Sequence, residues 1–267
     1  MSPKNEAQET SRHWEQRKLL HDLESSIENL DVHKLDVTRL KELNVNLCRM
    51  TLDRNSELKP HFFAPRHDYL PQPSDKILDE FFAPDPWPSS DGTASEDPYQ
   101  EAYATHIFWE SYAFHDVNFL DDAPWRSKDP GDYTPFGSLY QYDAPAFGAF
   151  ETVDVAGGQY PHFKAVIYND LEADNETCFR GELLIILRLM LGQLRKIRLL
   201  HHNIAPVLLV SLAGKRARVL EAYFDEGSQS LVVRSSELYE VSDRTSASKT
   251  FITLAEYFLG DPAGNTV

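Results

Sequence analysis

Residues 183–191, LLIILRLML, constrain the fold more than any other part of this sequence. They lie within Glu176–Leu200, where apolar residues occupy every side of a helix rather than one stripe. A helix that is apolar all round has to be buried, so we expect a central helix here. Arg195, Lys196 and Arg198 suit the negative end of its dipole.

Strand-forming sequences lie on both sides of this helix. They are Phe163–Tyr168, Pro206–Leu212, Ala217–Phe224 and Leu231–Arg234. Short, turn-rich links join the last three, which predicts an antiparallel meander. A final helix is predicted over Thr250–Phe258. The order β-α-β-β-β-α predicts an α+β core over residues 161–267, with a small, mostly antiparallel sheet.

Residues 1–59 are predicted to form a helical N-terminal arm. Apolar residues recur at spacings of three and four over residues 9–52, which fits either a helical hairpin or one long helix. The resulting apolar stripe could cover its own domain or meet another chain. It is therefore the predicted contact for a homo-oligomer or a protein partner.

Residues 60–160 are predicted to be an acidic, irregular segment that wraps the core. Between Pro60 and Phe150 lie 12 of the 16 prolines and 20 of the 31 aromatic residues. Proline at that density interrupts regular elements, and aromatics at that density argue against disorder. The proposed anchors are Phe62, Phe63, Phe81, Phe82, Trp87, Trp109 and Trp125. A loop is predicted over 84–98 and a helix over Tyr99–Phe114.

Charge is concentrated in the middle of the chain. The net charge is −16, and residues 60–160 hold 18 acids and 4 bases, or −14. Such a field repels nucleic acid and anionic membranes, so nucleic acid is an unfavoured partner. A candidate basic face consists of Arg195, Lys196, Arg198, Lys215, Arg216 and Arg218. Its simplest role is to neutralise the acidic middle segment.

The order of elements resembles the restriction-endonuclease-like core, in which acids on a helix and on strands hold a metal ion. A candidate polar cluster follows, made of Glu182, Arg216, Arg218, Glu221 and Asp225. The strand Leu231–Arg234 lacks the acid-x-Lys pair that such a site needs. The alternatives are a divergent nuclease-like binder without an intact active site, or acids paired with arginines.

Other catalytic motifs are absent from the sequence. It has no Walker loop, dinucleotide fingerprint, nucleophile elbow or H-E-x-x-H. The His61, His67, Asp68 and the His106, Glu110, His115 groups lack familiar metal spacing, so neither metal nor cofactor is predicted. Catalytic residues stay unassigned, and a non-catalytic binding or assembly protein is expected.

The predicted compartment is the cytoplasm or nucleus. Cys48 and Cys178 provide no disulfide framework. No apolar run reaches the ~18 residues of a membrane span, and the N-terminus lacks the apolar stretch of a signal peptide. We therefore expect a soluble intracellular protein.

The last ninety residues carry a resemblance. The segments APVLLVSLAG (205–214), RVLEAYFD (218–225) and LVVRSSELY (231–239) are similar to a family of uncharacterised proteins from filamentous ascomycete fungi. The resemblance implies a fungal source and names no activity. It motivates an alternative function: an enzyme or small-molecule binder accessory to specialised metabolism, with an aromatic-walled pocket between the middle segment and the sheet.

Overall fold

The structure is a computed structural model that describes residues 9–83, 97–116, 124–132 and 137–267. Its longer helices are α1 (Ser11–Glu28), α2 (Val37–Glu42), α3 (Asp75–Phe81), α4 (Pro98–Ser111), α5 (Arg180–Leu194) and α6 (Arg244–Phe258). Its strands are β1 (Lys34–Asp36), β2 (Val45–Arg49), β3 (Trp125–Lys128), β4 (Tyr140–Gln141), β5 (Phe147–Val155), β6 (Phe163–Asn169), β7 (Thr177–Phe179), β8 (Val207–Ala213), β9 (Arg216–Asp225), β10 (Ser230–Ser235) and β11 (Tyr239–Glu240). The short helical turns are η1 (Tyr112–Asp116), η2 (Pro130–Asp132) and η3 (Ile197–Leu199).

Over the described residues, nine strands form one mixed sheet in the order β2-β10-β9-β8-β6-β5-β3, with β11 beside β9 and β4 beside β5. The predicted small, mostly antiparallel sheet is therefore wrong. The meander β8–β9–β10 is antiparallel as predicted. The crossover through α5 makes β6 and β8 parallel, because a helix returns the chain to the same end of the sheet.

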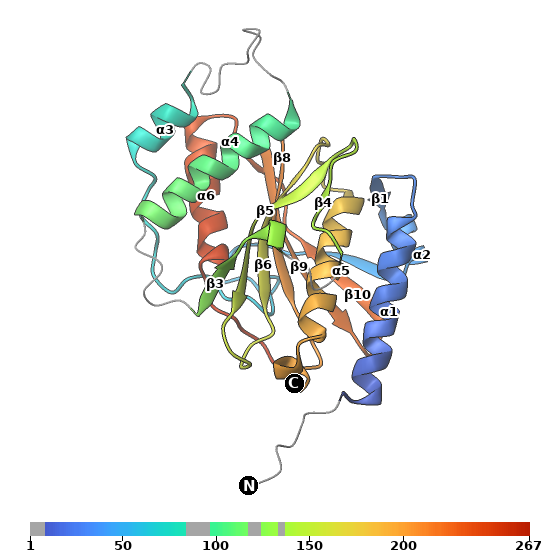
Figure 1. Ribbon diagram of the computed structural model, residues 1–267. Helices are drawn as coiled ribbons and strands as arrows, with labels where there is room; N and C mark the ends of the chain where they lie inside the picture. Colours follow the sequence, from blue (N-terminus) through green and yellow to red (C-terminus); the bar gives the residue numbers. More distant parts are fainter. Residues whose placement is uncertain (1–8, 84–96, 117–123, 133–136) are drawn as a thin grey trace.

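Helix α5 is the predicted central helix. All of its residues are buried, and it lies between the sheet and α1 (Figure 1). It is shorter than the predicted Glu176–Leu200 at both ends: Thr177–Phe179 pair with β1, and the helix ends at Leu194, before the separate turn η3. Glu182 fixes its first turn, since its carboxylate accepts a hydrogen bond from the Phe179 N–H at 2.8 Å.

The N-terminal segment is only partly helical. Helix α1 ends at Glu28, so the prediction of one long helix over residues 9–52 is wrong. A second helix does follow, α2, but β1 and β2 are strands where helix was predicted. Asn44 has φ 55°, which ends α2 and lets the next residues run as β2, parallel to β10. Leu40 belongs to α2 and Leu43 caps it, but Leu47, whose spacing fits the same helical repeat, belongs to strand β2.

The apolar stripe of α1 is covered by α5 of the same chain. Leu20 and Ile27 are fully buried in the core that α5 and the sheet share. Arg188 of α5 donates to the Glu24 carboxylate at 2.8 Å. Arg180 donates to the Ile27 carbonyl at 3.1 Å. The stripe is thus part of the protein's own core.

Helices α3, α4 and α6 cover the opposite face, so the fold has three layers (Figure 1). The described aromatic anchors pack there, namely Phe62, Phe63, Phe81, Phe82, Trp109 and Trp125. Trp87 and most of the loop predicted over 84–98 lie outside the described residues. Helix α4 confirms the helix predicted over Tyr99–Phe114, and the middle segment is otherwise more regular than expected, since it also supplies α3, β3 and β5.

A buried lysine joins this layer to the sheet. Lys164 of β6 is fully buried, and its ammonium donates to the carbonyls of Tyr257 and Phe258 at the end of α6 and of Gly260. It also lies 3.8 Å from the centre of the Trp125 ring. Burial lowers its pKa well below the usual value. The positive charge complements the carbonyl end of α6.

Within the described part of the chain, no helix combines the length and apolar character needed to cross a membrane.

Candidate anion-binding site

The predicted polar cluster does not converge. Glu182 lies on the α5 face of the sheet, where its carboxylate is 2.6 Å from the Arg218 guanidinium and both side chains are buried. Glu221 lies three residues after Arg218 on β9, so its side chain points to the opposite face of the sheet. There it lies 2.7 Å from Arg234. Each acid therefore has its own arginine.

The other two members are more exposed. Arg216 pairs with Glu240 at 2.9 Å, and both side chains are 47% exposed. Asp225 accepts hydrogen bonds from the backbone and the hydroxyl of Ser228 in the turn after β9, and these lower its pKa. The five residues thus occupy four separate environments.

The predicted basic face is also divided. Lys215 and Arg216 lie at the end of β8, whereas Lys196 and Arg198 precede the start of that strand. Since β8 has seven residues at about 3.3 Å each, the two groups are at opposite ends of the sheet. Arg218 is buried with Glu182.

Sequence reasoning missed a different cluster, which we call the basic cluster. Its centre is Asp154 of β5, whose side chain is fully buried. Four cations surround this carboxylate: Arg126 at 3.0 Å, Lys128 at 2.8 Å, Lys196 at 3.0 Å and Arg198 at 3.3 Å. Lys128, Lys196 and Arg198 all approach the same oxygen, Oδ2.

Two chain segments bring these cations together. Strand β3 pairs with β5 so that Arg126 lies opposite Asp154. Lys196 and Arg198 come from the turn that follows α5, where Lys196 also donates to Gln193. A β-bulge between Ala149 and Glu151 sets the later residues of β5 so that Asp154 faces this turn.

The turn containing Arg198 packs against a glycine. A Cβ added to Gly158 would lie 2.7 Å from the Arg198 carbonyl oxygen. A glycine is therefore required for this approach.

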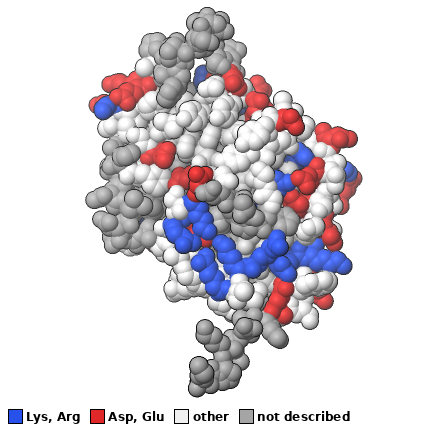
Figure 2. Space-filling model, viewed as in Figure 1, with Lys and Arg blue, Asp and Glu red and all other residues white. Residues whose placement is uncertain are grey.

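The cations face solvent while the carboxylate does not. The side chains of Arg126, Lys128, Lys196 and Arg198 are 51%, 29%, 20% and 36% exposed. Figure 2 shows Lys and Arg side chains as a band across this face. Together the four cations and Asp154 carry three excess positive charges.

The pKa values of both Asp154 and Lys196 are lowered in this cluster. Burial disfavours ionisation of Asp154, but hydrogen bonds and charges from Lys128 and Lys196 outweigh it, so the pKa of Asp154 is lowered. Burial lowers the pKa of Lys196 to about 8, although the Asp154 charge opposes the shift. Lys128 and Arg198 also repel the charged form of Lys196.

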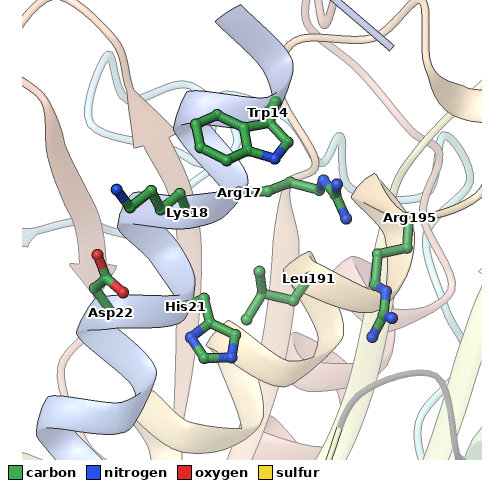
Figure 3. A pocket seen from close by; sticks show the side chains of 7 residues that line it. All are labelled: Trp14, Arg17, Lys18, His21, Asp22, Leu191 and Arg195. Carbon is green, nitrogen blue, oxygen red and sulfur yellow. The ribbon is translucent and has the colours of Figure 1, made fainter. Parts of the chain in front are cut away.

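A pocket of about 320 Å³ lies beside the basic cluster, between α1 and the end of α5. Its lining residues are Trp14, Arg17, Lys18, His21, Asp22, Leu191 and Arg195. Figure 3 shows Arg17 and His21 of α1 on the side of Leu191 and Arg195, whereas Lys18 and Asp22 point away from them. The pocket has an aromatic wall, but α1 supplies it rather than the middle segment.

Metal binding has no support among the described residues, where no three His, Cys, Asp or Glu side chains could hold an ion together. The His115 side chain lies outside the description. His106 is buried and stacks on Phe150 with ring centres 4.6 Å apart. Cys178 is fully buried, and its thiol donates to the Glu182 carboxylate. Burial, and then the charge of Glu182, raise the pKa of this thiol.

Comparison with protein-family models, with curated proteins and with solved structures found no match. The basic cluster therefore has to be interpreted from its own geometry.

Proposed function

We propose that this chain is a non-catalytic binding protein that holds a phosphate-type anion of its ligand in the basic cluster. The observation that carries the proposal is one buried carboxylate, Asp154, surrounded by four cations. A local positive patch on a protein of net charge −16 attracts a small anion to one place. The same overall charge disfavours a long polyanion such as nucleic acid.

The cluster has the donors that such an anion needs. The Arg126 guanidinium uses Nε and Nη2 on one oxygen of Asp154, which leaves three of its five N–H groups for other acceptors. Guanidinium and ammonium groups are the usual phosphate-binding side chains. Because Asp154 already holds the cations in place, an anion would bind with little loss of side-chain freedom.

The two buried acids of the predicted polar cluster support a non-catalytic role. Glu182 and Glu221 are buried and each forms a short ion pair with an arginine. The nuclease-like alternative has less support, since its proposed cations are divided between the two ends of β8 and the interior.

The test is binding of pyrophosphate, measured by calorimetry and by thermal unfolding. We expect pyrophosphate to stabilise the protein while sodium chloride of equal ionic strength does not. Arg126→Gln should weaken binding about tenfold, because one charge-assisted contact is lost. Arg126 is half exposed and three cations remain on Asp154, so this variant should fold.

Arg216→Gln is the matched control, because it removes an exposed, paired arginine outside the basic cluster. It should bind pyrophosphate as the wild type does. Equal losses in the two variants, or no stabilisation of the wild type, would show that the basic cluster does not bind anions.

A further inference from the structure

The pocket beside the basic cluster has the features of a site for a flat ring. Trp14 forms one wall and is 51% exposed, a large area for a tryptophan to leave in water. Leu191 also lines the pocket and is only 2% exposed. The exposed indole of Trp14 offers a planar aromatic ring a stacking surface, and the buried Leu191 closes the floor of the pocket.

The charges that line the pocket are mostly positive. Lys18 has its ammonium 5.7 Å from the centre of the Trp14 ring. Arg17 donates to both carboxylate oxygens of Glu9, at 2.6 and 2.8 Å, which offsets its charge, and Asp22 is the one acid that lines the pocket, so the positive charge comes from Lys18 and Arg195. A ring that enters this pocket would therefore do so beside cations, which suits a ring that carries anionic groups.

The pocket and the basic cluster share a border. Arg195 lines the pocket, and the next residue, Lys196, lies 3.0 Å from Asp154. Consecutive Cα atoms are about 3.8 Å apart, so the pocket and the basic cluster meet at neighbouring residues after the end of α5. The band of basic residues in Figure 2 runs across the face on which both lie.

We propose that the ligand is a nucleoside polyphosphate, with its base stacked on Trp14 and its phosphates in the basic cluster. This inference rests on the proposed anion binding and adds the aromatic part of the ligand. The pocket volume of about 320 Å³ lies within the range of small-molecule sites.

The experiment compares ATP with inorganic triphosphate by calorimetry. We expect the wild type to bind ATP about tenfold more tightly, because only ATP has a ring to stack on Trp14. Trp14→Leu should abolish this difference while leaving the affinity for triphosphate unchanged. Since Trp14 is half exposed, the variant should fold, which circular dichroism would verify.

Leu19→Ala is the matched control, because Leu19 is another exposed apolar residue of α1 and does not line this pocket. It should keep the preference for ATP. Equal affinity of the wild type for ATP and triphosphate would overturn the nucleotide assignment and leave anion binding intact. Failure to bind either compound would overturn both proposals.

Discussion

The Glu221 carboxylate lies 2.7 Å from the Arg234 guanidinium, directly across the β9–β10 ladder. The same carboxylate accepts hydrogen bonds from the N–H groups of His61 and Phe62 at 2.9 and 2.7 Å. Arg234 in turn donates to the Leu58 carbonyl at 2.9 Å. This buried ion pair thus holds the segment before α3 against strands β9 and β10.

Removing the charge of Glu221 should therefore be costly. Glu221→Gln leaves Arg234 buried without a counter-ion, and we expect a loss of about 3 kcal/mol in the free energy of unfolding. Glu240→Gln removes an exposed pair with Arg216 and should cost less than about 1 kcal/mol. Urea unfolding of both variants tests this, and similar losses would contradict it.

Stability should pass through a maximum near neutral pH. Burial lowers the pKa of His106 and His162 to about 4, so protonation of the unfolded chain below about pH 6.5 reduces stability as the pH falls. Burial, with the charge of Glu110, raises the pKa of Glu151 to about 8. Because the folded state retains that proton, stability falls as the pH rises toward 8.

Glu151→Gln isolates the second effect. The difference in unfolding free energy between wild type and variant should change by about 2 kcal/mol between about pH 6.5 and 8. Urea titrations at the two pH values measure it. A difference that does not vary with pH would mean that Glu151 is ionised in the folded protein.

A methyl group at Gly158 should disturb the basic cluster. Gly158→Ala forces the Arg198 backbone away from a contact of 2.7 Å, so we expect a loss of about 1–3 kcal/mol and weaker pyrophosphate binding. Gly227→Ala is the control, because the nearest atom would be at 3.6 Å. The idea fails if both variants bind pyrophosphate like the wild type.

Helix α1 should contribute directly to stability. Ile27→Ala empties part of the α1–α5 contact and should cost about 2–5 kcal/mol. Leu19→Ala changes a side chain that is 40% exposed, so its effect should stay within about 0.5 kcal/mol. Thermal and urea unfolding would show the difference. A neutral Ile27→Ala would mean that α1 packs loosely on α5.

The sequence predicted those elements whose pattern is local. The all-round apolar composition of residues 183–191 identified the central helix, and the three segments after it identified the meander. Strand β5 was missed because its bulge and its aromatic, acidic composition hide the alternation of a strand. Strand β2 was missed because the spacing of its leucine also fits a helix.

The candidate site depends on contacts that no local pattern encodes. Asp154 meets Lys196 across 42 residues of sequence and Arg126 across 28. Their spacing in the chain gives no indication that they meet, since the β-bulge and the α5 crossover decide it. The charge count, by contrast, correctly separated acidic and basic stretches without locating their contacts.

The pairing of β2 with β10 has a consequence for the timing of folding. Val45 pairs with Leu231, so the first strand of the main sheet receives its neighbour only after synthesis has passed residue 235. Contacts of such long sequence separation slow folding, because a large loop must close before they form. During translation β2 therefore has no partner strand in the main sheet until β10 has left the ribosome.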